Sequence, residues 1–172
     1  MKIINGFFFA TAALFSASVH AFDEADAARL VQRYSETVAC QLPAPYENTS
    51  LQYKTVQVTQ GMDQPDGFGA QYIVYWAGDE GCYGGNGTVR PNFTVVERSG
   101  FSSANPVVKT EYTMPDLSLV QVTDFYAGKR EGRVHIEGVA YGPDDPQGSP
   151  SKPVNYVLEL GFHGFKDVSG QD

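Results

Sequence analysis

Residues 133–162 read RVHIEGVAYGPDDPQGSPSKPVNYVLELGF. Apolar side chains alternate with more polar ones at both ends of this stretch, over 133–141 and 153–162. A period of two is typical of β-strands that bury one face and expose the other. The expected inward-facing side chains are Val134, Ile136, Ala140, Val154, Tyr156, Leu158, Leu160 and Phe162. The stretch therefore predicts two strands of a sheet that is covered on one side only.

Five further strand-like runs precede this pair, at 51–59, 70–76, 88–97, 106–112 and 117–126. Most of them are joined by short turns rich in glycine, proline and aspartate. The run 70–76 is apolar on both faces, as expected of a central strand. Seven strands without an intervening helix predict a mainly β fold, an antiparallel sandwich or barrel. The end, 166–172, is expected to be a short disordered tail.

Residues 23–39 carry the one clear helical pattern. Asp23 is suited to cap its start, and Cys40 and Pro43 follow its end. An apolar stripe recurs at helical spacing and consists of Ala27, Leu30, Val31, Tyr34 and Val38. The helix is therefore expected to pack on the rest of the domain through this stripe.

Residues 1–21 have the three parts of a secretory signal peptide: Lys2, an apolar run at 7–15, and small residues before a cut after Ala21. The apolar run is too short to span a membrane. No cysteine lies near the cut, so a lipid anchor is not expected. We expect a single β-rich domain over 22–172 that is periplasmic or secreted and not inserted in a membrane.

The net charge limits the class of partner. Lys2 is the only one of 12 basic residues in 1–21, so 22–172 holds 11 basic and 20 acidic residues, a net charge of −9. Such a surface repels nucleic acid and anionic lipid headgroups. It attracts a cationic protein partner, although the same charge also keeps an exported protein soluble. No nucleic-acid partner is expected.

Cys40 and Cys82 are the two cysteines of the chain. In an exported protein an even cysteine count predicts a disulfide, and here one intrachain pairing exists. The chain-entropy model assigns a bridge over this separation about 4 kcal/mol. The alternative is a zinc site, which would need His135 and His163 as well, at a spacing that matches no standard pattern. We therefore expect no metal and no cofactor.

The most unusual local segment is GDEGCYGGNGT, residues 78–88. No helix follows it, so it is not a phosphate-binding loop. One interpretation is a long hairpin loop pinned by the disulfide. The other is a rigid recognition loop that presents Asp79, Glu80 and Tyr83 to a partner.

A second long loop covers 141–153 and contains four prolines, which reduce its flexibility before any partner binds. Asp144 and Asp145 lie in it and are candidate contact residues. Their carboxylates also suit Ca²⁺, but the spacing is not that of an EF-hand, and a solvated turn is the simpler interpretation.

Catalytic signals are sparse. His135 or His163 is a candidate base, but no serine lies in a Gly-x-Ser-x-Gly elbow. Both histidines fall on the polar faces of expected strands, where an ordinary exposed histidine is common. Paired carboxylates for glycoside hydrolysis would have to come from Asp124, Glu137 and Glu159, whose convergence the sequence does not indicate.

The run YWAGDEGCYGGNGT, residues 75–88, resembles a group of small exported Gram-negative proteins with a Gly-Asp-x-Gly-Cys-x-Gly-Gly-x-Gly-Thr loop. The resemblance implies a periplasmic location and no particular activity. The general plan is also similar to that of periplasmic lysozyme inhibitors, which are compact antiparallel β-proteins. Residues 99–101, Ser-Gly-Phe, resemble the Ser-Gly start of their inhibitory loop, whereas 102–105 lack the tyrosine expected after it.

The expected function is that of a periplasmic binding protein. Its sharpest version is an inhibitor or immunity protein against a cell-wall-acting hydrolase, with the 78–87 loop as the contact surface and 144–151 as the next candidate. The alternative is a small periplasmic hydrolase that uses His135 or His163.

Overall fold

The structure is a computed structural model that describes residues 22–43, 51–62, 65–85, 87–99, 105–146 and 148–171. The expected signal peptide, 1–21, lies outside the described residues. The elements are α1 (Glu24–Val38), β1 (Thr55–Thr59), β2 (Gln71–Gly78), β3 (Arg90–Ser99), β4 (Asn105–Lys109), β5 (Gln121–Ala127), β6 (Arg133–Ala140), β7 (Lys152–Gly161) and β8 (Gly164–Asp167). The predicted mainly β fold with one N-terminal helix is confirmed.

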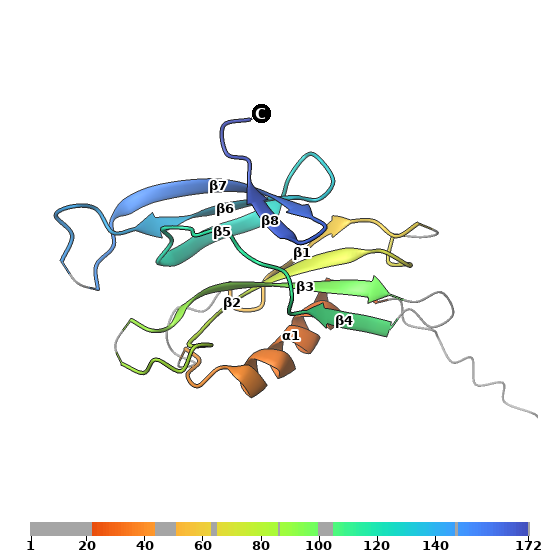
Figure 1. Cartoon of the computed structure of the whole chain (residues 1–172), viewed down its shortest axis with the longest axis horizontal. Coiled ribbons are helices and arrows are strands. Elements are labelled where there is room, and N and C mark those ends of the chain that lie inside the picture. Colours follow the sequence, from red (N-terminus) through yellow and green to blue (C-terminus); the bar gives the residue numbers. More distant parts are fainter. Residues whose placement is uncertain are drawn as a thin grey trace, which may run out of the picture.

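The strands form two four-stranded antiparallel sheets that lie face to face (Figure 1). In each sheet the strands are paired in chain order, β1-β2-β3-β4 and β5-β6-β7-β8. The chain thus completes one meander before it crosses, over 110–120, to the second. α1 covers the outer face of the first sheet, so the fold has three layers and is a sandwich with one helix.

The main core lies between the sheets and follows from the alternation in their strands. Ile73 and Val95 of the first sheet face Phe125, Ile136 and other apolar side chains of the second. The ring of Phe93 lies 5.5 Å from that of Phe125, centroid to centroid, and so joins β3 to β5. The predicted inward faces of 133–141 and 153–162 are confirmed for the buried Val134, Ile136, Ala140 and Leu158.

A second core lies between α1 and the first sheet. Asp23 caps the helix: its side chain accepts a hydrogen bond from Asp26 N at 2.9 Å. Ala27 and Val31 of the apolar stripe are fully buried against β2 and β3. β2 is covered by the helix on one face and by the second sheet on the other, which explains why 70–76 is apolar throughout. No described helix has the length and hydropathy needed to cross a membrane.

The chain end differs from expectation. Residues 164–167 form β8, so the expected disordered tail begins with a strand. Gly164 has a φ of 139°, and Phe165 N donates to Thr113 O at 2.9 Å. A side chain at Gly164 would meet Thr113 O at 2.5 Å, so glycine permits this close approach. Phe162, expected to face inward, is 88 % exposed because it lies in the β7–β8 turn.

The two sheets are also joined at the opposite edge. Gly132 N, in the turn between β5 and β6, donates to Val58 O at 2.7 Å. Lys54 Nζ, just before β1, lies 2.7 Å from Asp124 Oδ1 of β5. Contacts of this kind hold β1 beside the β5–β6 hairpin. The sandwich is therefore tied along both sides, and the loops project from its ends.

Candidate functional site

Two long loops project from the same end of the sandwich, at the left of Figure 1. The glycine loop (79–89) joins β2 to β3 in the first sheet, and the proline loop (141–151) joins β6 to β7 in the second. Residues 86 and 147 of these loops lie outside the described residues. The two segments with the most unusual composition are thus brought to one place from different layers.

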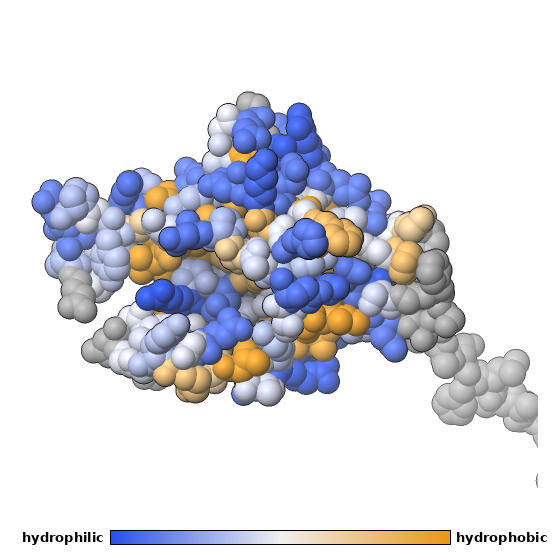
Figure 2. Space-filling model, viewed as in Figure 1, coloured by the Kyte–Doolittle hydropathy of each residue, from blue (hydrophilic) through white to orange (hydrophobic). Residues whose placement is uncertain are grey.

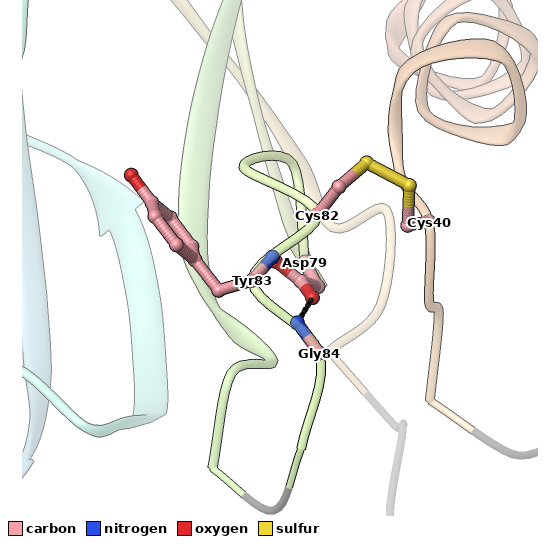
Figure 3. The surroundings of a disulfide bond; sticks show 5 residues. All are labelled: Cys40, Asp79, Cys82, Tyr83 and Gly84. Carbon is pink, nitrogen blue, oxygen red and sulfur yellow. Dashed lines mark hydrogen bonds between the residues drawn. A yellow bond between two sulfur atoms is a disulfide. The ribbon is translucent and has the colours of Figure 1, made fainter.

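The predicted Cys40–Cys82 disulfide is confirmed, with the Cα atoms 5.1 Å apart (Figure 3). It ties the segment after α1 to the glycine loop. Two backbone hydrogen bonds support the same contact: Cys40 N donates to Asp79 O at 3.0 Å, and Asp79 N donates to Gln41 O at 2.8 Å. Both cysteines are consumed in this bond, so the zinc alternative does not apply.

Asp79 is an internal anchor of the glycine loop. Its side chain is buried, with the residue 1 % exposed, and accepts hydrogen bonds from Tyr83 N at 3.2 Å and Gly84 N at 3.0 Å (Figure 3). The hydrogen bond from Gly84 N is the main reason that the pKa of Asp79 is lowered. Its carboxylate is thus buried and bonded within its own loop, so that Asp79 contacts a partner stays a prediction, and the observed contacts give it a structural role.

This anchor predicts a pH-dependent stability. The folded-state pKa of Asp79 lies below its ordinary value of 3.8, so the charged carboxylate stabilises the fold above about pH 4. That contribution is lost as the pH falls through the folded-state pKa. Asp79→Asn should therefore be less stable than the parent at pH 7, and the gap in the free energy of unfolding should shrink between pH 4 and pH 2, as followed by urea denaturation.

Asp144→Asn is the matched control for this prediction. Asp144 is exposed in the proline loop, and no described residue hydrogen-bonds to its carboxylate. Its substitution should leave the free energy of unfolding nearly unchanged across the same pH range. A gap for Asp79→Asn that is as large at pH 2 as at pH 7 would show that the loop does not depend on the carboxylate charge.

Tyr83 and Glu80 are the accessible residues among the three contact residues predicted in the glycine loop. Tyr83 is 80 % exposed and points away from the disulfide (Figure 3). Its ring lies over Gly81, where a side chain would collide with it. Glu80 is exposed and accepts a hydrogen bond from the hydroxyl of Tyr34 on α1 at 3.1 Å. Burial, followed by the charge of Glu80, raises the pKa of Tyr34.

The proline loop is closed by Asp145. Its carboxylate accepts hydrogen bonds from Gly142 N at 2.7 Å, Ser151 N at 2.7 Å and Ser151 Oγ at 2.6 Å. The Ser151 hydroxyl is the main cause of the lowered pKa of Asp145. Asp144, the other member of the expected pair, is exposed and makes no such contact with the described residues. Among the described residues no group of three or more His, Cys, Asp or Glu is placed to hold a metal ion.

A cleft of about 520 Å³ lies between the two loops and extends between the sheets. Figure 2 shows the molecule hollowed at this end, with apolar atoms along the upper wall. Its lining includes Leu51, Tyr75, Val89, Val120 and Tyr141, and among the described lining residues Arg90 is the one with a charged side chain. Sequence reasoning missed Leu51, Tyr75, Val89, Val120 and Arg90 as site residues, because none of them stands out in a motif and they converge only when the sheets pack.

The candidate catalytic histidines do not line this cleft. His135 lies on β6, where its ring stacks on that of Tyr126 at 5.1 Å, and His163 lies in the β7–β8 turn. Among the described residues no serine hydroxyl bonds to either ring. Of the carboxylates considered for glycoside hydrolysis, Asp124 and Glu137 lie opposite each other on β5 and β6, but Asp124 forms an ion pair with Lys54.

Glu159, the third carboxylate considered for glycoside hydrolysis, forms an ion pair: its Oε2 lies 2.8 Å from Arg133 Nε. Of the segment similar to the start of an inhibitory loop, 100–104 lies outside the described residues.

Comparisons of the chain with the models of known protein families, with curated proteins and with solved structures find no match.

Proposed function

We propose that this chain is an exported, periplasmic binding protein that recognises a protein partner with the loop-bearing end of its sandwich. The observation that supports this most is the placement of the glycine loop and the proline loop on either side of one cleft. The end of a β-sandwich is a common place for recognition, because loops there vary while the sheets hold them in position. The signal-like segment 1–21 supports export.

Both loops are organised before any partner binds. The disulfide and the Asp79 carboxylate hold the glycine loop, and Asp145 closes the proline loop. Little conformational entropy is then lost on association, which favours affinity. The exposed Tyr83 supplies the large amphipathic ring that is enriched among residues dominating binding energy.

The finer proposal is that the partner is a cationic, cell-wall-acting hydrolase, which the chain inhibits or confers immunity against. The net charge of −9 over 22–172 supports it, because opposite charge speeds the encounter of two proteins. Glu80 and Asp144 are the exposed carboxylates of the two loops that would act in this way. The hydrolase alternative with His135 or His163 lacks comparable support, because neither ring faces the cleft.

Tyr83→Ala should weaken binding of the partner by about 1–3 kcal/mol, because an exposed anchor ring is removed. The partner would first be captured from periplasmic extract on immobilised protein and identified by mass spectrometry. Affinities of the parent and the variant would then be compared by surface plasmon resonance. Tyr126→Ala removes an exposed tyrosine from β5, away from both loops, and serves as the matched control.

The charge component is tested separately. Glu80→Gln combined with Asp144→Asn should slow association at low salt and have little effect at high salt, where charges are screened. If Tyr83→Ala and this double variant both bind the partner as tightly and as fast as the parent does, the contact surface lies elsewhere on the molecule.

A further inference from the structure

The cleft continues as a groove along the seam between the two sheets. A second hollow of about 520 Å³ shares Val89, Arg90, Pro91, Val120 and Tyr141 with the cleft. A third, of about 170 Å³, shares Pro91, Leu117 and Leu119 with the second. The hollows therefore form one elongated seam groove, with the start of β3 on one side and the 117–122 segment on the other.

The lining of the seam groove mixes apolar side chains with the polar Ser118, Gln121 and Thr123, and two of its other polar groups are already bonded within the fold. Gln52 is part of the lining, but its amide is already bonded to Ala77, accepting from N at 2.9 Å and donating to O at 3.2 Å. The Tyr141 hydroxyl accepts from Gly148 N at 3.1 Å. Burial raises the pKa of Tyr75 to about 12, so its side chain stays uncharged. The apolar side chains of the lining suit an alkyl chain, which brings no polar group that needs a partner.

The charge of the lining differs along the groove. Of the described residues that line the cleft and the second hollow, Arg90 is the one with a charged side chain. It is exposed, and no described residue hydrogen-bonds or ion-pairs with its guanidinium. Asp116 lines the far, third hollow. An anionic group is therefore favoured beside Arg90, where the cleft meets the second hollow, and disfavoured beside Asp116 at the far end, which orients an amphiphile along the groove.

We propose that the seam groove binds a single-chain amphiphile with an anionic head, of the long-chain carboxylate class. The alkyl chain lies between β3 and the 117–122 segment, and the carboxylate pairs with Arg90. The second hollow, which lies between these segments, has a volume of about 520 Å³, within the range of sites for small molecules, roughly 300–1,000 Å³. This site goes beyond the protein-binding function and does not depend on it.

The test is calorimetric titration of the whole protein with octanoate, decanoate and dodecanoate below their micelle concentrations. Each added methylene should tighten the dissociation constant about two- to fourfold, as expected for burial of an alkyl chain. Dodecyltrimethylammonium should bind at least tenfold more weakly than dodecanoate, because its cationic head meets Arg90. No binding of dodecanoate, or equal binding of both head groups, would overturn the proposal.

Two variants locate the ligand. Arg90→Gln should weaken the binding of dodecanoate about tenfold and leave the binding of dodecanol unchanged. Arg130→Gln, a matched change in the exposed β5–β6 turn, should affect the binding of neither ligand. Val89→Trp should obstruct the groove and abolish binding, with circular dichroism confirming the fold. Dodecanoate binding that survives Arg90→Gln or Val89→Trp unchanged would overturn the assignment.

Two further measurements distinguish this site from a membrane-binding surface and from the proposed protein-binding surface. Binding to anionic phospholipid vesicles without binding of free dodecanoate would indicate a membrane surface and overturn the proposal. Tyr83→Ala should leave dodecanoate binding intact even where it weakens capture of the protein partner. A failure of the amphiphile-binding proposal would therefore be seen in the calorimetric titrations, and a failure of the protein-binding proposal in the capture and affinity measurements.

Discussion

Replacement of both Cys40 and Cys82 by serine is expected to lower the free energy of unfolding by about 4 kcal/mol. The bridge closes a sequence separation of 42 residues, so its removal returns much conformational freedom to the unfolded chain. The loss should lower the melting temperature by roughly 8–16 °C for a domain of this size. Urea denaturation and calorimetry of the oxidised parent and the variant measure it.

The reduced parent is the control, since it lacks the bridge but keeps every side chain in place. It should match the double variant to within about 1 kcal/mol. The backbone pairs between 40–41 and Asp79 remain available in both proteins, so the fold should survive while the glycine loop loosens. If the reduced parent and the double variant both lose less than about 1 kcal/mol in the free energy of unfolding, the bridge does not restrict the unfolded chain.

Trp76→Ala is expected to destabilise the protein by about 3–5 kcal/mol. Trp76 is fully buried between α1 and the first sheet, and its Nε1 donates to Thr94 Oγ1 at 2.8 Å. The ring also packs against Gly78, where a side chain would meet it at 2.5 Å. Truncation would therefore leave a cavity at the point where the helix, β2 and the glycine loop meet. Because this is the only tryptophan, unfolding must be followed by circular dichroism.

Trp76→Phe is the matched variant, because it keeps most of the apolar volume and removes the donor to Thr94. It should cost less than the alanine change, about 1–3 kcal/mol. An equal loss in both variants would show that the hydrogen bond, and not the packing of the ring, holds this junction.

Sequence patterns were sufficient for most of the fold because burial imposes periodicity locally. The alternation in 133–141 and 153–162 predicted β6 and β7 closely, and the Asp23 cap predicted the start of α1. β8 was missed because its four residues are too few to show a period. Its existence depends on pairing with β7 and on the contact of Gly164 with Thr113.

The candidate site was predictable in part. Composition singled out both loops, and the two cysteines allowed one pairing, which the structure confirms. Sequence could not show that Asp79 and Asp145 turn inward, because their partners are mainly backbone amides, which every residue carries. It gave no sign of Arg90, which is an ordinary surface residue until the sheets pack.

The fold class, the helix, the disulfide and the acidic charge follow from the sequence, since each depends on residue type or on a local period. Only packing of the sheets brings the glycine loop and the proline loop to one end and opens the seam groove between them. Those features arise from the order and direction in which strands far apart in the chain pack together. Nothing in a local pattern records that order, because it is set by the energy of the whole core.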